Sequence, residues 1–152
     1  MALVTTIKYN VIVSVFSIRF RRPGVYQRLK NQAAEQAESA SGLAERLIDE
    51  GLRMSAHPGI VFRDGPAGRR SALAAGPDIW QVAALLRDLN GSLDKRHLQA
   101  AERLGLNLEQ IRAASRYYAE FASAIDQEIE ANEQAADREL AAWQAERRLL
   151  SG

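Results

Sequence analysis

The stretch FSIRFRRPGVYQRLKNQAAEQAESASGLAERLIDEGLR, residues 16–53, is the part of the sequence that most strongly indicates the fold. It opens with an alternation in which Phe16, Ile18 and Phe20 are apolar and the intervening residues are polar. Since successive side chains of a strand point to opposite faces, the alternation predicts a short strand with one apolar face and one arginine-bearing face. Two amphipathic segments of about a dozen residues each follow, and they predict two helices.

A single strand of this kind cannot bury its apolar face or pair its backbone groups. A second copy of the chain supplies both, so the pattern predicts a homodimer in which two strands form an antiparallel ribbon. Such a ribbon is one of the few elements that fit the major groove of DNA. The alternative is that these residues form an ordinary strand-helix-helix part of a larger α+β core, with the arginines on its surface.

The segment AAEQAESASGLAERLIDEGLR, residues 33–53, resembles the ribbon-helix-helix family of bacterial repressors and antitoxins. In that family the second helix begins at a Ser-x-Ser pair, which is present here as Ser39 and Ser41. It continues through a buried Leu and apolar partners, here Leu43, Leu47 and Ile48, and closes where this chain has Gly51-Leu52. The resemblance implies a dimeric repressor that binds double-stranded operator DNA.

The resemblance also implies which residues touch the DNA, because the outward side chains of the family's strand contact bases and the start of its second helix holds a phosphate. By position, the base-contacting residues are Val15, Ser17, Arg19 and Arg21, and the phosphate-binding residues are Ser39, Ser41 and Gly42. The chain departs from the family at Ala37, where Gly or Asn is usual. The link between the strand and the first helix, residues 21–24, is also one residue longer than is usual in the family. The register of the ribbon in the DNA groove is therefore open by one position.

Length and composition set outer limits. A chain of 152 residues without cysteine accommodates one or two small domains and excludes disulfides and thiolate metal sites, which fits a cytoplasmic protein. The opening residues 1–14 are apolar but are interrupted by Lys8 and Asn10, so we expect neither a membrane span nor a signal peptide. They either extend the ribbon or reflect a misplaced start codon.

The small net charge of +1 conceals an uneven distribution along the chain. Residues 1–56 hold 8 basic and 5 acidic side chains, residues 57–121 hold 9 and 7, and residues 122–152 hold 3 and 7. A basic front suits nucleic acid, whereas an acidic tail is repelled by it and indicates a second kind of partner. The alternative is a surface of mixed charge without functional meaning.

A second module follows what looks like a linker at residues 54–59. Apolar triplets at residues 60–62 and 71–73 flank a turn at residues 64–68 and predict a hairpin. Asp78 and Gln81 form a capping box for a helix. Its inward stripe is Ile79, Val82, Ala83, Leu86 and Leu89, with Trp80 off the stripe. We expect Leu93, Leu98, Ala101 and Leu104 to point inward from the next helix, and Leu108, Ile111, Tyr118 and Phe121 from the one after the turn at residues 105–107.

The stretch LQAAERLGLNLEQIRAASRYY has the layout of a helix-turn-helix, and residues 57–121 resemble a winged-helix-type domain of unknown function found in bacterial antitoxins. If this module contacts DNA, its second helix should do so through Gln110, Arg112 and Arg116, with Glu109 and Ala113 also projecting outward. The alternatives are a plain helical corner or a dimerisation element.

Residues 122–152 predict a long acidic helix whose narrow apolar stripe includes Ile125, Ile129, Ala136, Leu140, Trp143 and Leu150. Such a stripe is typical of a tail that docks into an apolar groove, with Leu140 and Trp143 as anchors. The order of parts resembles type II antitoxins, which implies a toxin partner. For antitoxins of PIN-domain ribonucleases, it implies that Arg147 or Arg148 enters the acidic site. The alternative is a dimerising or frayed helix, with Trp143 packed on its own domain.

We expect no enzyme, metal or cofactor. His57 and His97 are the only histidines, His97 is expected at the surface or core edge, and no phosphate-binding loop is present. The fold expected is mainly α with a short β ribbon: an N-terminal extension at residues 1–14, a ribbon-helix-helix at 15–54, a hairpin with a winged-helix-like helix-turn-helix at 57–121, and a helical tail at 122–152. The function expected is an autoregulating repressor and antitoxin, and the alternative is a dimeric scaffold that does not bind DNA.

Overall fold

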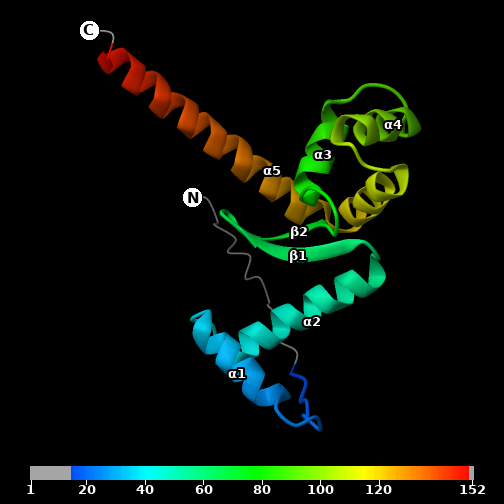
Figure 1. Ribbon diagram of the computed structural model, residues 1–152, viewed down its shortest axis with the longest axis vertical. Helices are drawn as coiled ribbons and strands as arrows, with labels where there is room; N and C mark the ends of the chain where they lie inside the picture. Colours follow the sequence, from blue (N-terminus) through cyan, green and yellow to red (C-terminus); the bar gives the residue numbers. More distant parts are fainter. Residues whose placement is uncertain (1–14, 151–152) are drawn as a thin grey trace, which may run out of the picture. The chain divides into compact units, whose positions relative to one another are not determined.

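The computed structural model describes residues 15–150, which form a mainly helical fold with one small antiparallel sheet and a long C-terminal helix (Figure 1). This broad fold class is the one that the sequence predicts. The chain divides into two compact units, of which the first ends at Ala44 and the second begins at Glu45. The expected N-terminal extension, residues 1–14, lies outside the described residues. Within the described part, no helix combines the length and apolar character needed to cross a bilayer.

The first unit contains α1 (Val25–Glu35) and the first turn of α2 (Ala40–Ala56). Both expected helices are therefore present. The turn between them closes when the amide of Glu38 donates to the carbonyl of Ala33 at 2.9 Å. Ala37 adopts the left-handed conformation in this turn, with φ of 52°, which is strained for a residue with a Cβ. The position has the backbone that favours Gly or Asn, although the chain places Ala there.

Residues 15–21 carry neither helix nor strand. A strand exists only when its backbone bonds to a neighbour, and no described strand of this chain pairs with the segment. The ribbon expected from the alternation of Phe16, Ile18 and Phe20 requires a second copy, so it stays a prediction.

The expected end of α2 at Gly51-Leu52 is wrong, because the helix continues to Ala56. The linker expected at residues 54–59 is accordingly wrong for its first three residues. Nothing in residues 52–56 breaks a helix, and Pro58 disfavours helical geometry only at the residue before it. Arg53 also holds this last turn in place, since its guanidinium donates to the hydroxyl of Tyr117 at 3.3 Å and stacks on Phe121 at 4.2 Å.

The second unit contains the expected hairpin. Strand β1 (Ile60–Gly65) pairs antiparallel with β2 (Gly68–Leu73), with Gly65 opposite Gly68 and Ile60 opposite Leu73. The buried end of the hairpin is the apolar end, at Ile60, Ala72 and Leu73. Two residues connect the strands. Gly68 has a φ of 96°, a backbone conformation that would be strained for a residue with a side chain.

Three helices complete the second unit: α3 (Ile79–Asp88), α4 (Leu93–Leu104) and α5 (Leu108–Leu150). Asp78 and Gln81 form the expected capping box of α3, and the expected inward face of α3 is buried at Ile79, Val82, Ala83 and Leu89. The expectation for α4 is wrong in part. Leu93 and Leu98 are 63% and 59% exposed, whereas His97 and Ala100 are buried. The inward stripe is 97, 100, 101 and 104, and it begins with His97, which the sequence predicts at the surface or core edge.

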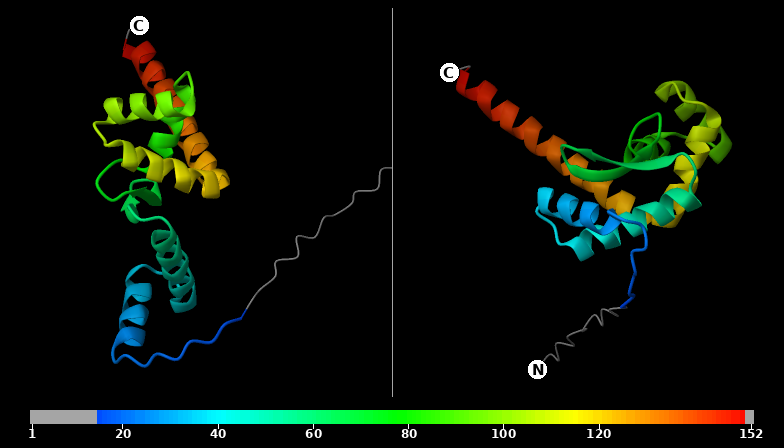
Figure 2. Two further views of the ribbon diagram at one scale, coloured as in Figure 1. Left: turned by 90° about the vertical axis from the view of Figure 1, so that its right-hand side faces the viewer. Right: turned by 60° about the horizontal axis from the view of Figure 1, so that its bottom comes forward.

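Helix α5 is continuous from Leu108 to Leu150, with a kink at Phe121, where φ is −115° and ψ is 32°. The kink coincides with the boundary at which the sequence separates the middle module from the tail. Before it, Ile111 and Tyr117 are buried; after it, Ile125 and Ile129 are buried. The right-hand view of Figure 2 shows the C-terminal part of α5 extending well beyond α3 and α4.

Candidate nucleic-acid and partner interfaces

The N-terminal segment presents large apolar side chains to solvent. Val15 and Phe16 are 90% and 84% exposed, and Ile18 and Phe20 are 47% and 40% exposed. Isolated exposed apolar residues are ordinary, but four within six consecutive positions are not. This row is the surface that a second strand would cover in the expected ribbon.

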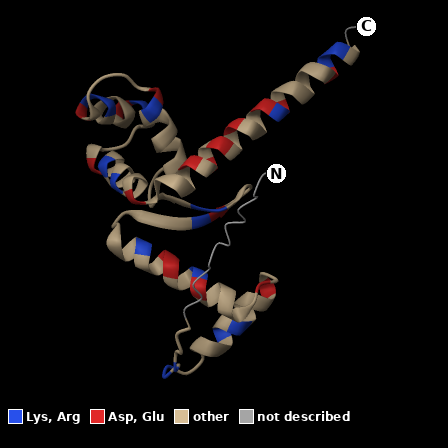
Figure 3. Ribbon diagram, turned by 180° about the vertical axis from the view of Figure 1, so that it is seen from behind, with Lys and Arg blue, Asp and Glu red and all other residues tan. Residues whose placement is uncertain are grey.

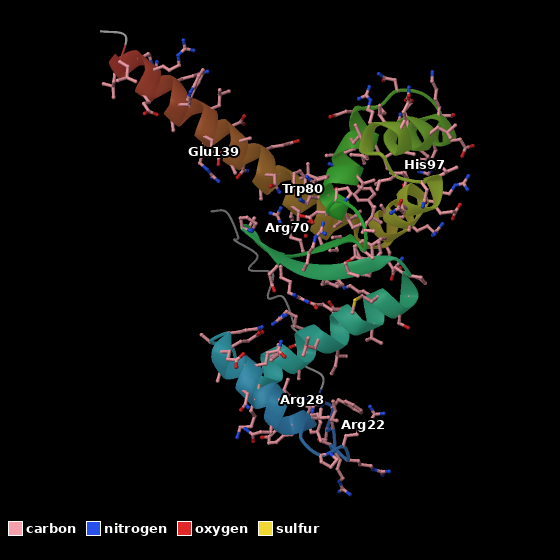
Figure 4. All side chains as sticks on the ribbon, in the orientation of Figure 1. Arg22, Arg28, Arg70, Trp80, His97 and Glu139 are labelled. Carbon is pink, nitrogen blue, oxygen red and sulfur yellow. The ribbon has the colours of Figure 1, made fainter. Side chains whose placement is uncertain are left out.

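Basic side chains surround the same row. Arg19 and Arg21 are exposed on the segment itself, and Figure 4 shows the Arg22 side chain pointing away from the backbone in the turn before α1. The segment is positioned at its end by an aromatic contact, since the rings of Phe20 and Tyr26 lie 5.6 Å apart, and Lys30 lies over Tyr26 at the same distance. The arginines are therefore placed immediately before a folded helix.

The start of α2 is capped by Ser39, whose hydroxyl accepts from the amide of Gly42 at 3.0 Å. The Ser39 hydroxyl is thus engaged within the helix. Ser41 is exposed, and the remaining amides of the first turn have no acceptor inside the helix. This helix start offers backbone donors and a positive dipole end for an anion, as the resemblance implies. A side chain at Gly42 would crowd the Ser39 hydroxyl, because its Cβ would lie 3.0 Å from that oxygen.

Helices α4 and α5 are joined by three residues, of which Gly105 is left-handed with φ of 64°. Gln110 is not a free side chain. Its Oε1 accepts from the amide of Asn107 at 2.9 Å, and its Nε2 donates to the carbonyl of Ala75 at 3.1 Å. Contact between Gln110 and a base would break both bonds.

Arg112 is bonded to Glu109 at 2.9 Å, which leaves Arg116 as the exposed cation of this face without a described partner. The expectation that Ala113 projects outward is wrong, because it is only 9% exposed.

The arginines of the hairpin are engaged within the second unit. Arg69 makes two bonds, of 2.6 and 2.8 Å, to the carboxylate of Glu50, which is only 5% exposed. Arg63 donates to Asp78 at 3.0 Å, and the guanidinium of Arg70 lies 5.8 Å from the centre of the Trp80 ring. Figure 4 labels Arg70 and Trp80. These arginines balance carboxylates and cover an aromatic ring. The hairpin, whose arginines are already engaged, is therefore better suited to a structural role than to DNA contact.

His97 is buried, and its expected place at the surface or core edge is corrected accordingly. Its Nε2 lies 2.8 Å from the hydroxyl of Ser115, so the pair joins α4 to α5. Burial lowers the pKa of His97, and the positive charge of Arg112 lowers it further. The neutral imidazole is thus the form that this core accepts. No signal in the sequence distinguishes such a histidine from a surface one, since its partner lies 18 positions away.

The tail presents the expected anchor residues to solvent. Leu140 and Trp143 are 52% and 51% exposed, and the guanidinium of Arg147 stacks on the indole of Trp143 at 4.8 Å. Arg148 is exposed beside it. Figure 3 shows acidic residues along the middle of α5. The arrangement is an apolar stripe within an acidic helix, as expected from the sequence.

Across residues 15–150 no three His, Asp or Glu side chains gather in a way that could hold a metal ion. Comparison of the chain with family models, with curated proteins and with solved structures finds no match in any of the three.

Proposed function

We propose that the protein is a dimeric, sequence-specific DNA-binding repressor that pairs its N-terminal segments as an antiparallel ribbon and serves as the antitoxin of a partner toxin. One observation carries the proposal: an exposed segment in which the apolar residues Phe16, Ile18 and Phe20 alternate with polar residues, among them Arg19 and Arg21, leads directly into two helices. A second copy covers the apolar side and brings the arginines of both copies onto one surface.

The second helix supports the same proposal. Leu47, Ile48 and Leu52 of α2 are 39%, 46% and 66% exposed, although their spacing is that of a buried helix face. A dimer that also covers these residues explains why an amphipathic helix leaves its apolar face in solvent. The Ser39-capped start of α2 then holds a DNA phosphate through backbone amides.

The direct test is binding to the DNA immediately upstream of the protein's own coding sequence, measured by mobility shift over a series of salt concentrations. Arg19→Ala should weaken this binding by about 1–3 kcal/mol, because it removes a bidentate contact to a base edge. Leu149→Ala is the control, since Leu149 is 84% exposed near the end of α5 and lies outside the proposed DNA surface. Unchanged affinity in a folded Arg19→Ala dimer removes Arg19 from the site, and equal loss in both variants indicates a general folding defect.

The exposed anchors Leu140 and Trp143 also favour a second candidate, a dimeric scaffold that holds a helical partner and binds no DNA. The two candidates separate in the same assay. A scaffold shows no preference for the upstream fragment over unrelated DNA of equal length at moderate salt, whereas a repressor does.

A further inference from the structure

One face of α5 is covered in its first part and uncovered in its last. Ile129 is 4% exposed against its own unit, and Ala136, Trp143 and Leu150 follow at steps of seven residues, which return to nearly the same side of a helix. Trp143 is 51% and Leu150 is 82% exposed. The face that the unit buries at Ile129 thus continues into solvent, and the part from Glu133 to Leu150, here termed the tail, lacks its cover.

Carboxylates border this face on both sides. At about 100° per residue, Glu139 and Glu146 lie on one side of Trp143, and Glu133 and Asp137 lie on the other. Pairing one tail with another tail would bring these like charges together, which is unfavourable. Arg147, which stacks on Trp143, lies on the side opposite Glu139 and Glu146. The surface that covers the tail should therefore be apolar in its centre and cationic where it meets Glu139 and Glu146.

The second unit has such a surface. A cavity of about 310 Å³ opens among α3, α4 and α5, and we call it the α3–α5 groove. Its apolar lining is Val82, Ala83, Leu86, Leu93, Ala114 and Ala119. Arg87 and Arg96 also line it. Leu93, which the sequence predicts to point inward, is 63% exposed at this groove. Its volume is at the lower end for a ligand site and suits one or two large side chains.

The two arginines differ in how far they are neutralised. Arg87 is bonded to Asp126 and to the hydroxyl of Tyr118, whereas Arg96 donates to the carbonyl of Gly91 at 3.0 Å and has no carboxylate partner among residues 15–150. Arg96 therefore keeps an uncompensated positive charge at an apolar cavity. The apolar anchors of the tail match this groove in polarity, and Glu139 and Glu146, on one side of Trp143, provide carboxylates for Arg96.

The tail cannot reach the groove of its own chain. Ala119 and Trp143 are 24 residues apart on the same helix, which separates them by about 36 Å. The only non-helical residue within α5 is Phe121, so nothing turns the helix back after that point. Docking of the tail into this groove has to be between two copies.

We propose that the tail of one copy docks into the α3–α5 groove of a second copy, and that the exchange is reciprocal about a twofold axis. Leu140 and Trp143 enter the groove, and the flanking carboxylates face Arg87 and Arg96. This inference requires neither DNA nor a toxin, so it stands apart from the proposed function. A toxin that binds Leu140 and Trp143 has to displace the second copy first.

The test uses photo-crosslinking in the full chain. Trp143 is replaced by benzoylphenylalanine, an aromatic photo-crosslinker, and ¹⁴N- and ¹⁵N-labelled chains are unfolded and refolded together before irradiation. We expect heavy-to-light adducts that join residue 143 to peptides containing residues 82–96 or 114–119. The same probe at Leu149, which is 84% exposed and outside the stripe, is the positional control. Adducts only within one chain, adducts only between tails, or no adducts in a folded protein overturn the proposal.

The second measurement uses a variant in which a large side chain fills the α3–α5 groove. Ala119 lines the groove and is exposed, so Ala119→Trp should occupy the cavity without disturbing the core. It should lower the yield of the mixed adduct about tenfold or more, as loss of a buried anchor does. Ala124→Trp is the matched control, because Ala124 is an exposed alanine of the same helix outside the groove. An equal yield in both variants contradicts docking in this groove, while binding to upstream DNA reports separately on the proposed function.

Discussion

The two units of the chain differ in how much core each possesses. In the second unit, twelve buried residues form one cluster that joins the hairpin to α3, α4 and α5. Among the described residues of the first unit, only Ala33 and Leu43 are buried, while Phe16 and Tyr26 remain 84% and 53% exposed. Burial of apolar area is the main source of folding stability, so the second unit holds much more of this stabilisation than the described part of the first.

Under the proposed ribbon dimer, the described part of the first unit completes its core by association. A segment that exposes alternating apolar residues gains burial only when another surface covers it. The main cluster of the second unit is buried within a single chain, and the exposed apolar features of that unit are Leu47, Ile48 and Leu52 of α2, the tail and the α3–α5 groove. The following predictions test this contrast, starting with the largest effect.

The core of the second unit should be sensitive to truncation. Ile111 is fully buried in the main cluster, and Ile111→Ala should lower the free energy of unfolding by about 2–5 kcal/mol through lost burial and a residual cavity. Chemical denaturation followed by circular dichroism measures the change. Leu98→Ala is the control on an exposed position and should cost no more than about 0.5 kcal/mol. Equal effects at both sites would show that this core is misplaced.

The first unit should respond to a charge placed in its exposed row. Ile18→Lys costs little in a lone chain, where Ile18 is already 47% exposed, but should weaken a ribbon dimer by about 2–3 kcal/mol. Sedimentation over a range of protein concentrations measures the dissociation constant. The Ile18→Lys variant and the reference protein that keeps Ile18 should both carry Ala119→Trp, so that tail exchange does not hold the copies together. An unchanged dissociation constant would show that this row is not an interface.

The buried histidine should make the second unit sensitive to acid. The pKa of His97 is lowered in the folded protein, whereas the unfolded chain takes up this proton near the ordinary value of about 6.5. The unfolded state therefore binds more protons below that pH, and stability falls as the pH drops through this range. Thermal unfolding between about pH 7.5 and pH 5.5 should show a smaller loss for His97→Gln than for the wild type. Parallel curves would contradict the assignment.

The turn of the first unit should be improved by glycine. Ala37 has a φ of 52°, so Ala37→Gly should relieve strain and stabilise the protein by about 0.4–1 kcal/mol. Ala34, an exposed alanine inside α1, provides the matched control, because Ala34→Gly should destabilise the helix by about 0.5–1 kcal/mol. Thermal melts of the protein measure both changes. Destabilisation by both substitutions would mean that Ala37 is not left-handed in the assembled protein.

Much of the fold follows from local patterns. The two N-terminal helices, the hairpin around residues 64–68 and the helix capped by Asp78 were all predicted, because periodicity, turn residues and capping pairs act over a few neighbouring positions. The errors occurred where distant residues decide. His97 was expected at the surface or core edge, but it is buried beside Ser115, eighteen positions away. Likewise, α2 continues to Ala56 in a fold where Arg53 reaches Tyr117.

The candidate interfaces divide in the same way. The sequence by itself determined the alternating arginine row and the acidic tail with its apolar stripe, since these depend on the spacing of residues along one element. Only the tertiary structure decided that Gln110 is engaged in a cap and at Ala75, that His97 points into the core, and that an apolar groove opens beside Arg96. The physical reason is that burial, pairing and cavities belong to several elements at once, and no periodicity within one element specifies where the others will lie.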